Sequence, residues 1–217
     1  MMTSLFSSFD PTSMTFQMNW ILMFSTMIIL PTNFWMKNSR WTMIKNKIIY
    51  KMNNEMKNIT SHKEILIFSL STFIIILTNN FMGLLPYNFT SPSHISWTMS
   101  LAIPMWMSII IYSWMKFTNI MFAHLLPSGT PKMIMPMMII IETTGIIIRP
   151  ISLSVRLMAN MIAGHLLMTL TGSNNSIEII SLTMPIQMIL MTFESAISII
   201  QAYVFATLIN LYSSETP

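Results

Sequence analysis

The chain has 217 residues, of which 53% are hydrophobic and only 8% charged, and its mean hydropathy is +0.62. These values predict one polytopic membrane domain covering residues 1–217 and exclude an ordinary soluble domain. The net charge of +4 does not indicate nucleic acid binding, because the basic residues gather in one segment between the first two apolar stretches. The absence of cysteine excludes disulfides and thiolate metal sites.

Methionine use and the N-terminal residues point to an organelle. The 26 methionines stand where leucine or isoleucine would serve as filler, as a mutational bias in a small AT-rich genome would produce. The first basic residue is Lys37, so we expect no cleavable signal before the first span. Local synthesis and insertion would fit this pattern.

The first predicted span covers residues 14–35, with Trp20 and Trp35 at the heights of the aromatic belts. A lysine-rich segment follows it directly. By the positive-inside rule this segment faces the mitochondrial matrix, or the cytoplasm in a bacterium. The N-terminus is therefore expected on the opposite side of the membrane.

The lysine-rich segment has a helical pattern over residues 40–60. Apolar side chains recur there at steps of three and four: Trp41, Ile44, Ile48, Met52, Met56 and Ile59. One face is thus apolar and the other cationic, which predicts an amphipathic helix on the inner membrane surface in contact with anionic lipid. A solvated loop is the alternative reading.

Four further apolar segments complete an all-α architecture of about five membrane-embedded helices. Residues 65–86 and 97–116 form a transmembrane hairpin with a polar connector on the outer side. Residues 133–172 would extend about 60 Å as a helix, twice the thickness of the hydrocarbon layer. Such a helix must tilt steeply, bend at Pro150, or do both. Together with the last helix, residues 183–212, it is predicted to form a steeply tilted antiparallel hairpin.

Polar residues mark one face of each long helix. On the first they fall within about 40° of one another at 100° per residue: Glu142, Arg149, Arg156 and Asn160. On the second they are spaced by seven: Gln187, Glu194 and Gln201. His165 falls on the opposite face from Arg156 unless the helix bends.

Folding the two long helices into an antiparallel pair brings their polar residues to matching heights. The spacing pairs Arg156 with Gln201 near the middle and His165 with Glu194 toward the outer end. An imidazole beside a carboxylate is typical of an intramembrane proton relay. Arg156 stays charged and suits a fixed electrostatic barrier or counter-charge better.

Other interpretations of these residues remain. A lone histidine in an apolar helix usually makes an interhelical hydrogen bond, and Asn160, Gln187 and Gln201 could do the same. A secondary transporter would also bury charges at mid-membrane, but no paired halves with matching broken helices are apparent. An intramembrane hydrolase would need a nucleophile–base pair or a metal cluster, and neither motif is present. A phosphate-cradling loop is also missing, which argues against direct nucleotide binding.

The C-terminal motifs closely resemble those of one family, subunit a of the Fo sector of ATP synthase in its animal mitochondrial form. The resemblance rests on the run from Arg149 to His165, on Glu194, and on Gln201-Ala-Tyr-Val-Phe. It extends to the N-terminal Leu5-Phe-Ser-Ser-Phe-Asp10 and to Asn80-Phe-Met-Gly-Leu-Leu-Pro86-Tyr. Nearly the whole chain is covered.

The resemblance implies a non-catalytic stator subunit that conducts protons through two offset half-channels beside a rotating ring of c subunits. By this resemblance Arg156 faces the ring carboxylate, His165 and Glu194 line the outer half-channel, and Glu142 lies on the matrix path. Asn160 and Gln201 are polar neighbours, and Arg149 is left outside the relay. The expected partners are the c ring, other membrane-sector and peripheral stalk subunits, lipid and protons. We expect the mitochondrial inner membrane, and no nucleic acid, cofactor or metal.

Overall fold

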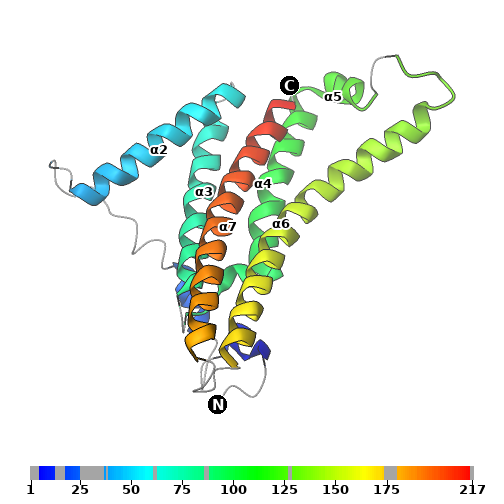
Figure 1. The fold of residues 1–217 in the computed structure, drawn as a ribbon. Helices are drawn as coiled ribbons and strands as arrows, with labels where there is room; N and C mark the ends of the chain where they lie inside the picture. Colours follow the sequence, from blue (N-terminus) through cyan, green and yellow to red (C-terminus); the bar gives the residue numbers. More distant parts are fainter. Residues whose placement is uncertain are drawn as a thin grey trace.

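The computed structural model describes residues 5–12, 18–24, 37, 39–60, 63–85, 88–126, 129–173 and 180–215. The regular elements in these ranges are helices, drawn in chain order in Figure 1. They are η1 (Leu5–Phe9), η2 (Met18–Phe24), α2 (Arg40–Ile59), α3 (Lys63–Leu84), η3 (Ser91–Ser93), α4 (Ile95–Lys116), α5 (Thr118–His124), α6 (Met135–Ser173) and α7 (Ile180–Glu215).

Four of the described helices are long and apolar enough to cross a membrane: α3, α4, α6 and α7. The predicted all-helical membrane architecture is therefore confirmed. The predicted first span, residues 14–35, lies mostly outside the described residues. Its described part, Met18–Phe24, forms the short 3₁₀ helix η2.

The helices α3, α7, α6 and α4 pack in that order, with α7 between α3 and α6 (Figure 1). The α3–α7 contact is the most extensive. Ile76 of α3 and Phe205 and Ala206 of α7 are almost completely buried in the same hydrophobic core. Most apolar side chains of α6 and α7 stay exposed instead, as they would in a protein solvated by lipid and by other membrane subunits.

The two long helices α6 and α7 run antiparallel and in contact, as predicted (Figure 1). At 1.5 Å per residue the 39 residues of α6 extend about 58 Å. Its C-terminal half lies beside α7, whereas its N-terminal half leans away from α4 and α7 (Figure 1). Pro150 lies within the helix, where its missing N–H removes one backbone hydrogen bond.

The bundle has two distinguishable ends. At the α2 end lie α2, α5, the start of α6 and the C-terminus of α7 (Figure 1). At the η1 end lie η1, the end of α6 and the start of α7 (Figure 1). The imidazole Nε2 of His94, which precedes α4, is 3.0 Å from the carbonyl oxygen of Phe9 and so ties η1 to the bundle.

The helix α2 is capped at its start and docked near its end. The Ser39 hydroxyl accepts a hydrogen bond from the N–H of Thr42. Lys57 lies in the last turn, where its positive charge interacts favourably with the helix dipole. Met52 and Met56 are buried on α3 and α7, and the Asn210 amide Nδ2 donates to the Met56 sulfur at 2.7 Å. Trp41, which precedes these residues on the helix, remains exposed.

Candidate functional site

A cavity of 660 Å³, which we call the η1 cavity, opens at the η1 end of the bundle. His165 of α6 and Glu194 of α7 line it, together with Ser7, Ser8 and Asp10 from the N-terminal segment. An adjoining cavity of 140 Å³ is lined by the same His165 and Glu194 and also by Asn160. His165 and Glu194 thus stand between the mouth of this site and Asn160, one helical turn from Arg156.

The predicted His165–Glu194 pair shares both cavities, and no direct hydrogen bond joins the two side chains among the described contacts. Glu194 is only 9% exposed, and its Oε1 atom and the Nε2 atom of His165 are buried without a hydrogen-bond partner in the described part of the chain. Buried polar atoms in this state need a water or an exchangeable proton partner. Both cavities far exceed the roughly 10–15 Å³ that one water molecule needs.

Two neighbours define the place of the His165 ring. The Phe9 ring of η1 lies against it edge to face, with ring centroids 6.2 Å apart and an interplanar angle of 88°. The imidazole also interacts with the backbone of Gly83 at the end of α3. Both η1 and α3 therefore meet α6 at His165, although only α6 and α7 were expected there.

Gly164 has no side chain, and this leaves room for the Glu194 carboxyl group. A Cβ atom placed on Gly164 would lie 2.8 Å from Cδ and 2.9 Å from Oε1 of Glu194. Only glycine leaves that space next to His165, so α6 and α7 approach closely where the carboxyl group sits. Gly164 falls within the motif from Arg149 to His165, but the sequence carries no signal for this role.

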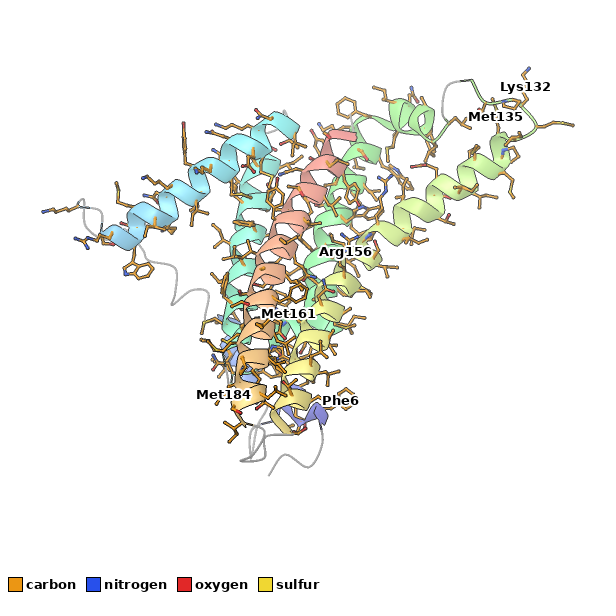
Figure 2. All side chains as sticks on the ribbon, viewed as in Figure 1. Phe6, Lys132, Met135, Arg156, Met161 and Met184 are labelled. Atoms are coloured by element: carbon orange, nitrogen blue, oxygen red, sulfur yellow. The ribbon has the colours of Figure 1, made fainter. Side chains whose placement is uncertain are left out.

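Arg156 is exposed on α6 near the middle of the bundle (Figure 2). Its backbone carbonyl accepts a hydrogen bond of 3.2 Å from Nε2 of Gln201 on α7. The structure therefore brings the predicted pair together, but the amide binds the main chain and leaves the guanidinium outside the α6–α7 contact. The next residue, Leu157, is buried.

A third cavity, which we call the α2-end cavity, has a volume of 420 Å³ and is lined by Glu142 and Arg149 of α6 and Tyr212 of α7. A guanidinium nitrogen of Arg149 lies 3.7 Å from Oε1 of Glu142. The Arg149 guanidinium carbon lies 5.0 Å from the centroid of the Tyr212 ring, within the range of a cation–π contact. The residue left outside the relay is thus in direct contact with Glu142.

Polar groups therefore occur along the whole length of α6. Glu142 lies at the α2-end cavity, His165 lies at the η1 cavity, and Arg156 lies between them with its side chain exposed. Asn160 lines the smaller cavity, and Gln201 has a buried, unpartnered Oε1. Gln187 lies within van der Waals distance of a Cβ placed on Gly172 and lines none of these three cavities.

Comparison with known sequences gives the family. The sequence profile described as "ATP synthase A chain" matches residues 13–214. The chain is 47% identical to ATP synthase subunit a of Aedes albopictus over 99% of both chains. It is 46% identical to subunit a of Drosophila melanogaster and 45% identical to that of Anopheles gambiae, with the same coverage.

The chain belongs to the ATP synthase A chain family. It is a proton-conducting, non-catalytic stator subunit of the Fo membrane sector, and its partners are other Fo subunits. The recognition made from the C-terminal motifs is confirmed. Because α3, α4, α6 and α7 are each long enough to span, this member of the ATP synthase A chain family is a multi-pass membrane protein.

Proposed function

We propose that this subunit conducts protons through two offset half-channels whose inner ends are separated by Arg156. The observation that carries the proposal is the exposed Arg156, which lies on α6 between cavities at opposite ends of the bundle. Glu142 precedes it by about 21 Å along the helix, and His165 follows it by about 14 Å. The half-channel at the η1 end contains His165, Glu194, Asn160 and, at its inner limit, Gln201. The half-channel at the α2 end contains Glu142.

Arg156 requires an anionic partner in the membrane. Exposed apolar side chains occur on both helices near its height: Ile151, Val155, Ile199 and Ile200. A guanidinium facing lipid at this depth would cost roughly 2.5–3.5 kcal/mol or more. A rotating ring of c subunits with one membrane-embedded carboxylate each would cover this surface and supply the counter-charge.

The distribution of charge supports an orientation. The basic residues of α2 lie at the α2 end: Arg40, Lys45, Lys47, Lys51 and Lys57. By the positive-inside rule this end faces the mitochondrial matrix, and the N-terminus faces the intermembrane space. The η1 cavity is then the entry from the outer side and the α2-end cavity is the exit to the matrix, in the mitochondrial inner membrane.

The basic face of α2 supports two further assignments. With its exposed Trp41, Ile44 and Ile48, α2 fits a helix lying on the matrix leaflet in contact with anionic lipid. The matrix end also offers surface to the peripheral stalk and to other membrane-sector subunits. The whole chain then acts as one membrane domain.

Cross-linking in the assembled complex tests the central assignment. Because the chain has no cysteine, Ala159→Cys introduces a single thiol on an exposed position one turn from Arg156. A bifunctional thiol reagent should join it to a cysteine placed beside the ring carboxylate. Phe68→Cys is a matched control, because Phe68 is exposed on α3, away from α6. Equal cross-linking at Phe68 and Ala159, or none at Ala159, would contradict the proposal.

A further inference from the structure

The η1 cavity has a wall that the two long helices do not supply. Ser7, Ser8, Asp10 and Thr12 of the N-terminal segment line it together with His165 and Glu194. Asp10 is exposed, and it is the third ionisable side chain among the lining residues, beside His165 and Glu194. No ion-pair partner for Asp10 occurs in the described part of the chain.

The N-terminal segment is held at this cavity by several contacts. Its Phe9 ring packs on His165, and the Phe9 carbonyl contacts His94, as described above. The Asn19 amide Nδ2 donates to the carbonyl oxygen of Asp10 at 3.4 Å, which ties the residue to η2. Figure 2 shows Phe6 of η1 beside the C-terminal end of α6. The contacts of Phe9 and the hydrogen bond from Asn19 to the Asp10 carbonyl therefore hold Asp10 at the cavity.

The groups farther inside are suited to receive protons. Glu194 is nine-tenths buried with an unpartnered Oε1, and His165 has an unpartnered Nε2. Both atoms belong to side chains that line the cavity also lined by Asp10. A volume of 660 Å³ leaves room for many water molecules between these groups.

We infer that Asp10 is a proton-collecting carboxylate at the mouth of the η1 cavity. Its ionised carboxylate accepts a proton from hydronium or from a protonated buffer in the outer solvent. It then releases that proton through water to His165 or Glu194 and returns to its ionised form, so no proton is gained or lost overall. This inference rests on the proposed function of the η1 cavity as the outer half-channel.

The short range over which a charge attracts protons explains why the position of Asp10 matters. At physiological ionic strength the Debye length is about 8 Å, so a charge concentrates protons only close to itself. Even at a diffusional limit of about 10¹⁰ M⁻¹ s⁻¹, protons at pH 7 would arrive only about 10³ times per second. A negative charge within the wall of the cavity raises that supply where it is used.

The test uses the intact ATP synthase in mitoplasts, where the outer face of the membrane meets the medium. Proton uptake from that side is measured at fixed inner pH while the outer pH and the buffer concentration are varied. Asp10→Asn removes the charge with almost no change in shape, and Asp10→Glu restores it. Glu55→Gln is the matched control, because Glu55 is an exposed carboxylate on α2 at the other end of the bundle.

Asp10→Asn should reduce proton uptake about tenfold at pH 8, the lower end of the range known for electrostatic steering. Uptake should match that of the unmodified protein at about pH 6, or at pH 8 with concentrated outer buffer, because protons or protonated buffer then reach the cavity unaided. Asp10→Glu and Glu55→Gln should behave like the unmodified protein. The titratable groups facing Asp10 in this profile are His165, Glu194 and the nearby His94.

Two outcomes would overturn the inference about Asp10 alone. One is normal uptake by Asp10→Asn at every pH. The other is a defect that buffer and low pH do not relieve, because Asp10 would then be only a structural residue. Glu194→Leu in the same preparation separates these outcomes from failure of the proposed half-channel: it should block uptake at all buffer concentrations. Normal uptake by Glu194→Leu would remove the half-channel and, with it, the role of Asp10.

Discussion

Gly164 of α6 and Glu194 of α7 fit together across the contact between the two long helices. A Cβ on Gly164 would come within 2.8 Å of the Glu194 carboxyl carbon and within 3.1 Å of its Cγ. The carboxyl group therefore occupies the space of an absent methyl group. Its position between the two cavities depends on this one glycine.

Gly164→Ala should displace the Glu194 carboxyl group and slow proton uptake from the η1 end. The contact is with the far part of a flexible side chain, so the carboxyl group can move while the helices stay in place. Alanine also favours helix by about 1 kcal/mol over glycine, so the protein should remain folded. Proton conductance of the reconstituted membrane sector, together with thermal unfolding, measures the two effects separately.

Two variants make this experiment specific. Gly145→Ala changes a glycine of the same helix that has no atom within 4 Å of the added Cβ, and it should conduct normally. Adding Glu194→Asp to Gly164→Ala shortens the carboxylate by one methylene and should recover part of the lost conductance. A normal rate for Gly164→Ala alone would show that the position of Glu194 does not limit proton entry.

Met56→Ala should release the end of α2 from the bundle. Met56 is fully buried, and its sulfur accepts the hydrogen bond from Asn210 of α7. Truncating a buried methionine typically costs about 2–5 kcal/mol, which would raise the population of detached α2 by at least about 30-fold. Tryptic cleavage at the α2 lysines should accelerate accordingly.

Met43→Ala is the matched control for α2, because Met43 lies on the same helix and is 50% exposed. Its cleavage rate should stay close to that of the unmodified protein. If Met56→Ala and Met43→Ala are cleaved equally fast, the docking of α2 does not depend on the Met56 contact.

The apolar pattern of the sequence was enough to predict the helical architecture. Long apolar runs predict α3, α4, α6 and α7 because the membrane requires their length and composition. Spacing alone brought Arg156 and Gln201 to the same height, since two antiparallel helices have few registers. The hydrogen bond itself goes to the backbone, which spacing cannot reveal.

The features that could not be predicted from the sequence all depend on tertiary packing. Phe9 meets His165 from a short 3₁₀ helix that has no strong periodic signal. Tyr212 contacts Arg149 from the far end of another helix. The apolar face of α2 was predicted to contact lipid, but the same periodicity would also suit a protein contact. The structure buries Met52 and Met56 against α3 and α7 and leaves Ile44 exposed.

Arg149→Gln should alter proton transfer through the α2-end cavity without unfolding the protein. The side chains of Arg149 and Glu142 are 33% and 45% exposed, and such ion pairs contribute only about 0–1 kcal/mol in water. Because losing this pair changes stability so little, a loss of conduction in Arg149→Gln would report on the position and charge of Glu142. Tyr212→Phe keeps the aromatic face beneath Arg149 and should be close to normal, whereas Tyr212→Leu should resemble Arg149→Gln.

The measurement for Arg149 is ATP-driven proton pumping in inside-out vesicles, with the pH on the matrix side varied. Arg149→Lys should retain part of the activity, because it keeps the charge but loses the planar guanidinium. Identical pH profiles for Arg149→Gln and the unmodified enzyme would exclude a role for the Arg149–Glu142 contact in conduction.

Arg156→Ala should abolish ATP synthesis while permitting passive proton flow through the membrane sector. An opposite charge within about 4–6 Å favours the ionised form of a carboxylate, so a fixed guanidinium makes each passing ring carboxylate release its proton. Without it, a protonated carboxyl group could pass between the half-channels unchallenged, and protons would leak without driving rotation. Because the side chain of Arg156 is exposed while its carbonyl binds Gln201, the substitution should leave the α6–α7 contact intact.

Arg156→Lys should also couple poorly, because a strongly hydrated, titratable ammonium does not replace a planar, always charged guanidinium. Both ATP synthesis and proton conductance must be measured in the same vesicles, since a loss of assembly would lower both together. Coupling failure lowers synthesis alone. An Arg156→Ala enzyme that makes ATP at the normal rate would show that the barrier between the two cavities lies elsewhere in the protein.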